Sequence, residues 1–481
     1  MKADALFGKA WLDKFENTEI KGIAYDSRNV MEGYVFVCIK GFETDGHKFA
    51  KMAEKNGAAV IVAEDKIDVN VPVWYVENSR KAIADLACAF YGNPSERFKL
   101  IGVTGTNGKT TTTYLIRSIL EEAGMCVGII GTNQNIIGDK VLVTQSTTPT
   151  TPNALELQQL FAEMAESSAD CVVMEVSSHA LELERVRGCH FDVGVFTNLT
   201  QDHLDFHKTM ENYRNAKSKL FDISDKGVIN IDDESGRLIA SQKGGKCGLL
   251  TVGLSDDAGL WAENIKITAR GSEFDAHCNG AAGHFTIAIP GKFSVYNALC
   301  AAGAALELGV DIETVKRGLE KAKGVLGRVE VVPTDTDYTV IIDYAHTPDG
   351  LENIIKTVKE FAAGRVITLF GCGGDRDNTK RAVMGEIAGK YSDFSIITSD
   401  NPRTENPEKI VGQIAEGMKR TDGKYITIVD RREAIAYALD NAKKDDVIIL
   451  AGKGQETYQI IGKEKFDFDE RVEVYKHLEG K

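Results

Sequence analysis

The stretch KLIGVTGTNGKTTTTYLIRSILEEAG, residues 99–124, is the most informative part of this 481-residue chain. The apolar run KLIGV predicts a strand, and TTYLIRSIL predicts an amphipathic helix. Between them, the glycines of TGTNGKTT let the backbone curl so that N–H groups point at phosphate oxygens. The helix N-terminus adds the positive end of its dipole. A strand, glycine loop and helix in this order predict a P-loop, although the G-x-x-G-K-T spacing is shorter than the common form.

The side chains of this loop suit ATP and Mg²⁺. Lys109 can reach the β- and γ-phosphates, and the Thr110 hydroxyl can ligate Mg²⁺. The alternative is a glycine-rich turn that binds nothing, but the lysine and the hydroxyls together argue against it. We expect the following residues to bind the nucleotide: Gly105, Thr106, Asn107, Gly108, Lys109, Thr110 and Thr111.

Two other segments offer metal ligands. Glu175 ends the apolar strand of VVMEVSSHAL, where a carboxylate beside a P-loop suits Mg²⁺; the alternative is an exposed acid at a strand end. His203, in NLTQDHLDFH, is a second candidate. His203 and His207 have H-x-x-x-H spacing, but neither a third ligand nor an H-E-x-x-H pattern supports zinc.

Strands and helices alternate along most of the chain. Apolar runs such as CVGIIG, DCVVMEV and VGVFTNL predict strands, and further runs follow residue 333. Residues 261–290 predict antiparallel hairpins, and helices are predicted at 79–91 and 295–308, with glycines after them. The pattern predicts an α/β fold with mostly parallel sheets and helices on both faces. We expect three domains, at residues 1–97, 98–331 and 332–481.

Composition excludes several classes of protein. There are 57 Lys and Arg residues against 71 Asp and Glu, a net charge of −14, which argues against nucleic-acid binding through bulk charge. No apolar run approaches a membrane-spanning length, and the N-terminal sequence does not resemble a secretory signal. The nine cysteines form no C-x-x-C pair and fit reduced thiols. We expect a cytoplasmic protein with neither nucleic-acid nor membrane partners.

A series of motifs in a fixed order points to a family. They are TGTNGKTT, STTP, MEVSSHAL, TNLTQDHLDFH, YRNAKSKLF, GKFSVYNALCAA, DYAHTPD, GCGGDRD, SDNPRTENP and GKGQETYQ. Over nearly its whole length the chain resembles the Mur ligases, ATP-dependent enzymes that extend the peptide stem of the bacterial cell-wall precursor. The resemblance implies a mixed α/β N-terminal UDP-binding domain, a central P-loop ATPase and a C-terminal Rossmann-like domain. The central domain would combine a parallel sheet with a small antiparallel one.

The resemblance also implies roles around the nucleotide. In the family the lysine of the A-K-x-x-L-F segment, here Lys217, is carbamylated and helps to position Mg²⁺; a carbamate offers oxygen ligands to a hard metal. Without the motif Lys217 is one lysine on a charged helix, and Lys219 is an equal candidate. The implied catalytic residues are Lys109, His203 and Lys217, and the implied metal ligands are Thr110, Glu175, His203 and Lys217. Asn297 is expected to contact adenine, Arg328 and Asp343 the phosphates and ribose, and His346 to lie near the nucleotide.

For the UDP-sugar substrate, the resemblance implies contacts from several separate motifs. Ser27 lies in a D-S-R motif, although by itself it reads as a turn residue. Where relatives often carry Gln this chain has Leu183, to which we assign no contact. The contacts expected with the muramoyl dipeptide are Thr147, Thr148, Ser177 and Arg185.

For the amino-acid substrate, the segment Asp400-Asn401-Pro402-Arg403 matches the D-N-P-R motif of relatives that add meso-diaminopimelate. Arg403 can pair with the distal carboxylate that diaminopimelate has and lysine lacks. Glu456 suits the distal ammonium group. The alternative is that D-N-P-R is only a turn. Expected contacts in this site are Arg376, Asp400, Asn401, Pro402, Arg403, Gly452 and Glu456.

The resemblance therefore implies a monomeric ligase that uses ATP and Mg²⁺. It would add meso-2,6-diaminopimelate to UDP-N-acetylmuramoyl-L-alanyl-D-glutamate through an acyl phosphate. The nearest alternative adds L-lysine instead. A folylpolyglutamate synthetase would share the ATPase core but lacks the UDP domain and the D-N-P-R segment. Two alternatives of other classes are a nucleotide-switch binding protein without ligase activity and a metabolite kinase.

Overall fold

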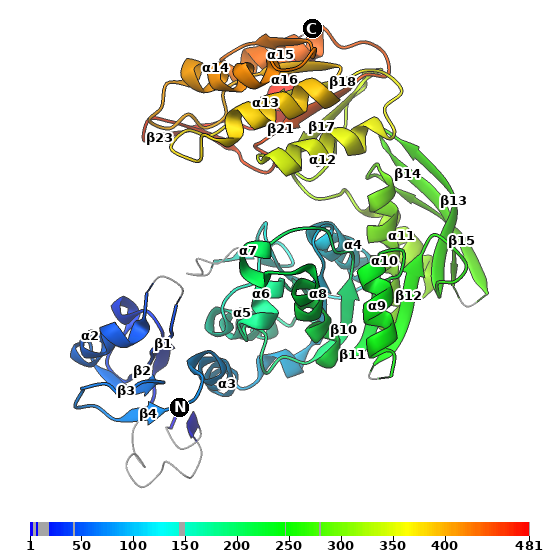
Figure 1. The fold of residues 1–481 in the computed structure, drawn as a ribbon. Helices are drawn as coiled ribbons and strands as arrows, with labels where there is room; N and C mark the ends of the chain where they lie inside the picture. The colour runs from blue at the N-terminus through cyan, green and yellow to red at the C-terminus, as the bar shows by residue number, and fades with distance from the viewer. Residues whose placement is uncertain are drawn as a thin grey trace. The chain divides into compact units, whose positions relative to one another are not determined.

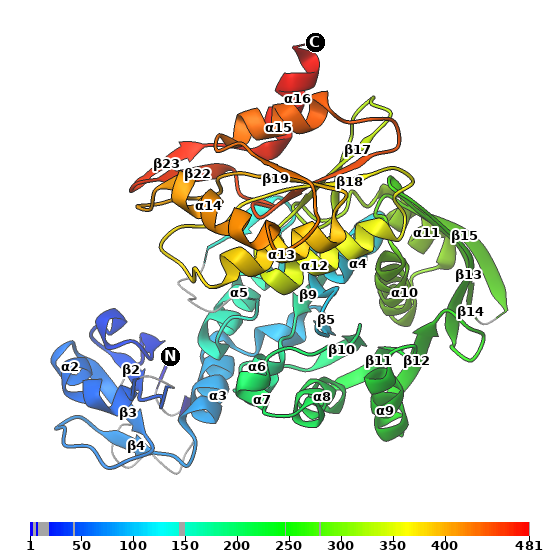
Figure 2. The ribbon, with the colours of Figure 1, turned by 45° about the horizontal axis from the view of Figure 1, so that its top comes forward.

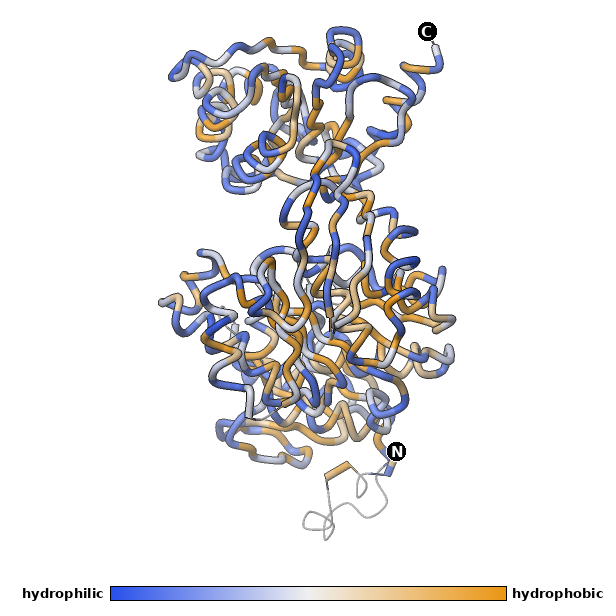
Figure 3. The backbone as a smooth tube through the Cα atoms, turned by 90° about the vertical axis from the view of Figure 1, so that its right-hand side faces the viewer, coloured by the Kyte–Doolittle hydropathy of each residue, from blue (hydrophilic) through white to orange (hydrophobic). Residues whose placement is uncertain are grey.

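The computed structural model describes residues 1–2, 6–7, 19–41, 44–143, 150–245, 247–278 and 280–480 (Figure 1). Contacts between residues divide the chain into two units, one of residues 1–260 and 300–315 and one of residues 261–299 and 316–481. In both, stretches of apolar and polar residues alternate along the backbone (Figure 3). None of the described helices combines the length and apolarity needed to cross a membrane.

A parallel sheet of four strands opens the first unit. Its strands pair in chain order: β1 (Gly22–Ala24), β2 (Tyr34–Val37), β3 (Ala58–Ala63) and β4 (Val73–Tyr75). Val35 and Val37 pack with residues of α3 (Ser79–Tyr91) in one apolar cluster. Phe36 belongs to a second cluster, with residues of α2 (Ala50–Lys55). Because successive side chains point to opposite faces, the continuous apolar run of β2 buries both faces of the sheet.

Helix α3 confirms the helix predicted at 79–91. The Asn78 side chain accepts hydrogen bonds from the N–H groups of Arg80 and Lys81, both at 3.0 Å, and so caps the first turn. The helix ends at Gly92, whose φ of 73° is left-handed and suits glycine.

The strand that precedes the P-loop is an inner strand of the larger sheet in the first unit. Its order in this unit is β12-β11-β10-β5-β9-β6-β7-β8, in which β12 to β6 are parallel and β7 and β8 antiparallel. Figure 2 labels β12, β11, β10, β5 and β9 of this sheet. The strands are β5 (Lys99–Thr104), β6 (Val127–Ile130), β7 (Asn135–Ile137), β8 (Lys140–Leu142), β9 (Cys171–Glu175), β10 (Phe191–Phe196), β11 (Ser224–Asn230) and β12 (Gly248–Gly253). The chain moves from β5 to β6 on one side and later to β10 on the other. The carboxyl end of β5 is therefore a topological switch point, where α/β sheets bind ligands.

Helices connect these strands. They are α4 (Lys109–Glu122), α5 (Ala154–Glu166), α6 (Ser178–Glu182), α7 (Leu204–His207), α8 (Met210–Ser218) and α9 (Glu234–Lys243). Short 3₁₀ turns are η2 (Ser27–Asn29), η3 (Gly46–Phe49), η4 (Pro94–Arg97) and η5 (Lys219–Asp222).

The hairpins predicted at 261–290 are present. Strand β14 (Gly271–Cys278) lies between β13 (Leu260–Thr268) and β15 (Ala281–Ile287), and pairs with β15 in antiparallel fashion. Helices α10 (Lys292–Glu307) and α11 (Ile312–Lys321) follow. The start of α10 was predicted three residues too late, because the Ser294 hydroxyl bonds the Pro290 carbonyl at 2.8 Å and the first turn forms directly after Gly291.

The remaining residues of the second unit build a sheet covered on both faces. Its order is β16-β17-β21-β18-β19-β20, parallel except for β16. One apolar cluster joins it to α12, α13 and α14, and another joins it to α15 and α16 (Figure 1). The strands are β16 (Glu330–Val332), β17 (Thr339–Asp343), β18 (Val366–Phe370), β19 (Phe394–Ile397), β20 (Tyr425–Thr427) and β21 (Val447–Ala451), and a separate hairpin is formed by β22 (Tyr458–Ile461) and β23 (Glu464–Asp467). The helices are α12 (Pro348–Lys359), α13 (Lys380–Tyr391), α14 (Pro407–Met418), α15 (Arg431–Asp440) and α16 (Glu470–Glu479).

A fully buried ion pair joins α15 to α16. The Arg431 guanidinium donates to Glu470 Oε1 at 2.7 and 2.9 Å, and both side chains are 0% exposed. Arg431 also donates to the Ala451 carbonyl at 2.9 Å, at the end of β21. The pair therefore stabilises the carboxyl edge of the sheet as well as the helix contact.

We predict that Glu470→Ala lowers the free energy of unfolding of this sheet by about 3–5 kcal/mol, because it leaves the Arg431 charge buried without its carboxylate. The loss is measured by urea unfolding, in which hydrogen exchange at β19 and β21 reports the unfolding of this sheet. Glu352→Ala, which removes an exposed pair with Lys356, is the control and should leave the midpoint nearly unchanged. Equal midpoints for the two variants would contradict the prediction.

Candidate nucleotide and amino-acid sites

The P-loop backbone depends on two glycines. Gly105 has a φ of 150°, and a Cβ at this position would lie 1.9 Å from Thr197 Oγ1. Gly108 has a φ of 83° and directly precedes α4. Because glycine suits both positions, the chain turns tightly after β5 and α4 begins at Lys109. The first N–H groups of a helix have no partner within it and form an anion site.

Lys109 folds back over this loop. Its Nζ donates to the carbonyl oxygens of Gly105 and Thr106 at 3.0 and 2.9 Å. The Asn107 N–H donates to Asn198 Oδ1 at 3.0 Å, which ties the loop to the segment after β10. Residues of the expected nucleotide loop thus lie together, with an ammonium group beside the turn.

Glu175 and Thr110 are neighbours. The Thr110 hydroxyl donates to Glu175 Oε1 at 2.9 Å, and the N–H and hydroxyl of Thr132 donate to the same carboxylate at 3.0 and 3.1 Å. Glu175 is 1% exposed at the end of β9. Two of the four expected metal ligands, Thr110 and Glu175, are therefore in contact. Thr132, which we did not predict, bonds the same carboxylate.

Lys217 is buried against the same loop. Its side chain is 2% exposed, its Nζ donates to the Gly105 carbonyl at 2.8 Å, and it lies 4.6 Å from the Tyr213 ring centroid. Burial, followed by the charge of Lys109, lowers the pKa of Lys217 well below its usual value. Lys219, the other candidate, is half-exposed and pairs with Glu182 at 2.8 Å. Tyr213 was not predicted, although its place four residues before Lys217 puts both on one helix face.

The histidines of this region differ in their surroundings. His203 is half-exposed, with its ring 4.9 Å from that of His179 and 6.0 Å from that of Tyr213. His207 is buried, bonds Ser178 Oγ at 2.8 Å, and has a pKa lowered to about 4 by burial. Among the described residues the only group of three suited to a metal is Asp45, His47 and Asp65, so no zinc cluster forms around His203 and His207.

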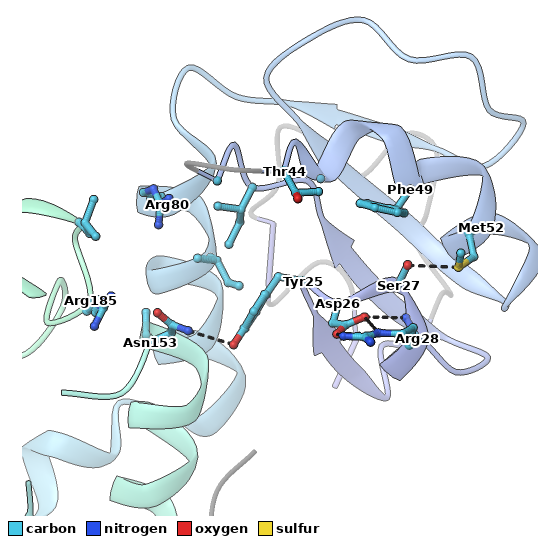
Figure 4. A pocket seen from close by; sticks show the side chains of 16 residues that line it. Tyr25, Asp26, Ser27, Arg28, Thr44, Phe49, Met52, Arg80, Asn153 and Arg185 are labelled. Carbon is cyan, nitrogen blue, oxygen red and sulfur yellow. Dashed lines mark hydrogen bonds and ion pairs between the residues drawn. The ribbon is translucent and has the colours of Figure 1, made fainter. Parts of the chain in front are cut away.

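A cavity of about 530 Å³ gathers residues expected to bind the UDP-sugar. Ser27 and Arg185 line it, together with Leu183 and two further cations, Arg28 and Arg80 (Figure 4). Asp26 also lines the cavity and pairs with Arg28, so the positive character of the wall, which suits an anionic ligand, comes from Arg80 and Arg185.

Tyr25 joins this cavity to α5. Its hydroxyl donates to Glu156. It also accepts from Asn153 Nδ2 at 3.0 Å, the bond that Figure 4 marks with a dashed line. Burial, followed by the charge of Glu156, raises the pKa of Tyr25, and burial also raises the pKa of Glu156. The loop that carries Ser27 is thereby held to the P-loop part of the chain.

Ser177 and Arg185 share a partner. The Thr151 hydroxyl bonds Ser177 Oγ at 3.3 Å and donates to the Glu175 carbonyl at 2.9 Å. Arg185 donates to the Thr151 carbonyl at 2.9 Å. These dipeptide contacts therefore lie next to Glu175. Thr147 and Thr148 lie outside the described residues.

In the second unit, Asp343 ends β17 in a buried position. It accepts from the N–H groups of Val329 and Ala345, both at 2.8 Å, and burial raises its pKa. The neighbouring Arg328 lies over the Tyr344 ring at 5.5 Å. Asn297 is 3% exposed on α10, and His346 bonds the Tyr344 carbonyl at 2.8 Å. Arg328, Asp343 and His346 thus come together after β17.

The D-N-P-R segment forms a loop after β19 that backbone hydrogen bonds hold in place. Arg403 has a left-handed φ of 50°, its N–H donates to the Ile460 carbonyl at 3.1 Å, and the Gly462 N–H donates to its carbonyl at 2.7 Å. Its Nη1 donates to the Gly374 carbonyl at 2.9 Å, whereas its Nε and Nη2 bond no described residue. Arg403 can therefore still offer two donors to a carboxylate.

Arg376 differs from its expected companions. It is exposed and donates to the Asp375 carbonyl at 3.1 Å. Gly452, with a φ of 115°, lies at the end of β21 beside Asp400.

A lysine that we did not predict connects the other residues of this site. Lys453 is 0% exposed, and its Nζ lies 3.3 Å from Asp400, 3.2 Å from Asn401 and 3.3 Å from Glu456. The signal was available, because Lys453 lies between two glycines in AGKGQE at a strand end. A charged residue inside such an apolar strand-end turn points to a polar site.

Comparisons with known proteins agree with the resemblance. Three family models match: Mur ligase family, catalytic domain, at residues 19–91; Mur ligase middle domain at 103–305; and Mur ligase, glutamate ligase domain, at 327–454. UDP-N-acetylmuramoyl-L-alanyl-D-glutamate--2,6-diaminopimelate ligase 1 of Clostridium acetobutylicum is 52% identical over 460 residues, covering 95% of this chain and 94% of the relative. The ligase of that name from Caldanaerobacter subterraneus is 52% identical over 466 residues, covering 96% and 95%.

Solved structures extend the likeness to the fold. A UDP-N-acetylmuramoyl-L-alanyl-D-glutamate--2,6-diaminopimelate ligase is 32% identical, with a TM-score of 0.74 and coverage of 97% of this chain and 96% of that one. Folylpolyglutamate synthase of Mycobacterium tuberculosis, in complex with ADP, is 17% identical, with a TM-score of 0.59 and coverage of 77% and 91%, and shares the fold alone. The α/β architecture expected from the resemblance is confirmed. With matching models in three parts of the sequence and relatives 52% identical along its length, this chain belongs to the Mur ligase family.

Proposed function

We propose that this chain is an ATP-dependent ligase that joins meso-2,6-diaminopimelate to UDP-N-acetylmuramoyl-L-alanyl-D-glutamate in peptidoglycan precursor synthesis. The observation that carries the proposal is the 52% identity, over 95% of the chain, to a relative named for this reaction. Residues 1–97 would bind the UDP-sugar, 98–331 the nucleotide and 332–481 the amino acid. We expect a monomer that works in the cytoplasm, where ATP is available.

The proposed reaction has two steps. The side-chain carboxylate of the D-glutamyl residue attacks the γ-phosphorus of ATP, forming an acyl phosphate and releasing ADP. An amine of diaminopimelate then attacks the acyl carbon, an amide forms and phosphate leaves. We propose that Lys109 and the first N–H groups of α4 offset the charge that develops on the transferred phosphoryl group, which the position of Lys109 at the P-loop supports.

The residues beside the P-loop fit Mg²⁺. Thr110 and Glu175 present hydroxyl and carboxylate oxygens within 2.9 Å of each other, and hard oxygen donors are what Mg²⁺ prefers. We propose these two residues, with His203 and a carbamylated Lys217, as the groups that hold the metal. Bound Mg²⁺ would neutralise phosphate charge.

Lys217 suits carbamylation because its amine is buried and its pKa is lowered, so that more of the amine is neutral and can add to CO₂. A carbamate on Lys217 would place an anion beside the cationic Lys109, since both amines bond the Gly105 carbonyl. We propose that Lys217 is the modified lysine.

The two substrates are assigned to the sites already described. The cavity that Ser27 lines would take the UDP-sugar, and Thr147, Thr148, Ser177 and Arg185 would contact its muramoyl dipeptide. Asn297, Arg328 and Asp343 would bind ATP. Diaminopimelate would bind at Arg376, Asp400, Asn401, Pro402, Arg403, Gly452 and Glu456.

The direct test measures phosphate release from ATP in the presence of UDP-N-acetylmuramoyl-L-alanyl-D-glutamate and either meso-diaminopimelate or L-lysine. The proposal expects release with diaminopimelate and a product that contains it. Release with lysine but not with diaminopimelate would show that lysine is the acceptor. The absence of release with both amino acids would favour a nucleotide switch or a ligase for another acceptor.

Lys109→Ala is expected to lower kcat by about a thousandfold or more, because it removes a positive charge from the phosphoryl-transfer site. Steady-state phosphate release checks the loss, and thermal unfolding should remain close to the wild type. Lys140→Ala, an exposed lysine on β8, serves as the control and should keep normal turnover. Near-normal turnover of Lys109→Ala would contradict the P-loop assignment.

Arg403→Ala should lower kcat/KM for diaminopimelate by about a hundredfold or more, because a charge-assisted contact with the distal carboxylate is lost. The KM for ATP should change little. Arg420→Ala provides a comparison at an exposed arginine of the same unit. If Arg403→Ala raised the KM for ATP and the KM for diaminopimelate equally, Arg403 would have only a structural role, through its bond to the Gly374 carbonyl.

Incubation with carbon-13 bicarbonate should give a carbamate signal in the NMR spectrum of the wild type and none in Lys217→Ala. Acidification should remove the signal, because protonation of the amine favours loss of CO₂. Lys219→Ala is the matched control and should retain it. An unchanged signal in Lys217→Ala would place the modification on another lysine.

A further inference from the structure

Lys453 is a buried ammonium group surrounded by oxygen atoms. Besides Asp400, Asn401 and Glu456, its Nζ donates to the Tyr458 carbonyl at 2.7 Å. Burying an ammonium group is costly unless oxygen atoms replace its water. The arrangement therefore fixes the positions of these acceptors, which belong to the D-N-P-R loop, the β21–β22 connection and β22.

The Glu456 carboxylate is held by one oxygen only. Its Oε2 accepts from Lys453 Nζ at 3.3 Å and from Asn401 Nδ2 at 2.9 Å. Its Oε1 bonds no described residue, and the side chain is 19% exposed. Since Oε2 is fixed, the rotation of the carboxylate is fixed, and Oε1 remains available to accept from a cation.

Asn401 links the same lysine to Arg403. Its Oδ1 accepts from Lys453 Nζ at 3.2 Å and from the Ile460 N–H at 2.9 Å, so its amide can point only one way. The Ile460 carbonyl in turn accepts from the Arg403 N–H. Hydrogen bonds through Asn401 thus connect the anionic Glu456 and the cationic Arg403. This pair suits the end of a ligand that carries both an ammonium and a carboxylate group.

We propose that Lys453 is a positioning residue that selects acceptors with a second amine, by holding Glu456 so that Oε1 meets the distal ammonium of the amino-acid substrate. This inference rests on the proposed function. Lys453 itself touches Glu456 and Asn401, and acts on the substrate through them.

The test compares meso-diaminopimelate with 2-aminopimelate, which keeps both carboxylates and lacks the second amine. Lys453→Met should raise the KM for diaminopimelate by about 10- to 100-fold, as loss of an orienting partner typically does. The KM for 2-aminopimelate and the KM for ATP should stay close to their wild-type values. Lys463→Met, an exposed lysine in the β22–β23 turn, is the control and should behave as wild type.

A double-mutant comparison separates positioning from general support. Glu456→Gln should show the same acceptor-selective loss, and combining it with Lys453→Met should add little, because both changes remove one interaction. Should Lys453→Met fail to fold, Lys453→Gln, which keeps a donor but lacks the charge, must show the selective loss.

Three results would overturn the inference: unchanged kinetics in the Lys453 variants, equal losses with both acceptors, or fully additive effects with Glu456→Gln. A wild-type enzyme that releases no phosphate with diaminopimelate would instead overturn the proposed function, before any variant is compared.

Discussion

The contact between Gly105 and Thr197 is the constraint on which the nucleotide half of the molecule depends. Strands β5 and β10 are paired up to Thr104 and Phe196, and the next residues of each chain segment touch. Thr197 Oγ1 occupies the place of a Gly105 side chain and donates to the Asn107 carbonyl at 2.7 Å. The loop therefore turns where β10 dictates, and the Gly105 carbonyl becomes the acceptor for both Lys109 and Lys217. The two amines therefore lie close together, and burial, followed by the charge of Lys109, lowers the pKa of Lys217.

Buried charges play a similar part in the second unit. Arg431 reaches the Ala451 carbonyl at the end of β21, and Lys453 lies just beyond it. Glu470 and Asp400 supply the opposing charges. Single exposed ion pairs contribute little to stability, whereas buried, hydrogen-bonded ones fix geometry at a desolvation cost. In this unit they fix the loops at the carboxyl edge of the sheet, where parallel sheets bind ligands.

Local patterns in the sequence were enough for much of the fold. Helix 79–91 has a capping Asn78 before it and Gly92 after it, and the P-loop carries its glycines within a few residues. The site was predictable only where a motif names it. Lys217 and Lys219 look alike in the sequence, but only Lys217 is buried. The bond between Tyr25 and Glu156 joins residues 131 positions apart, and no local pattern pairs them. The position of Lys453 after a buried strand indicates a polar site, but its acceptors Asp400, Asn401 and Tyr458 lie on other segments, and no local pattern names them.

The bond between Tyr25 and Glu156 has a consequence for dissecting the chain. Glu156 is 8% exposed on α5, and its Oε2 has no partner among the described residues. A truncation that removes the residues before 98 would take away Tyr25 and open the α5 face to water. The carboxylate would then ionise more readily, and the cavity wall that includes Arg185 would face solvent. Cutting out the P-loop part of the chain therefore changes its surface. Nucleotide affinities measured on such a fragment would come from a protein whose α5 face and Arg185 are exposed to water, unlike those of the whole chain.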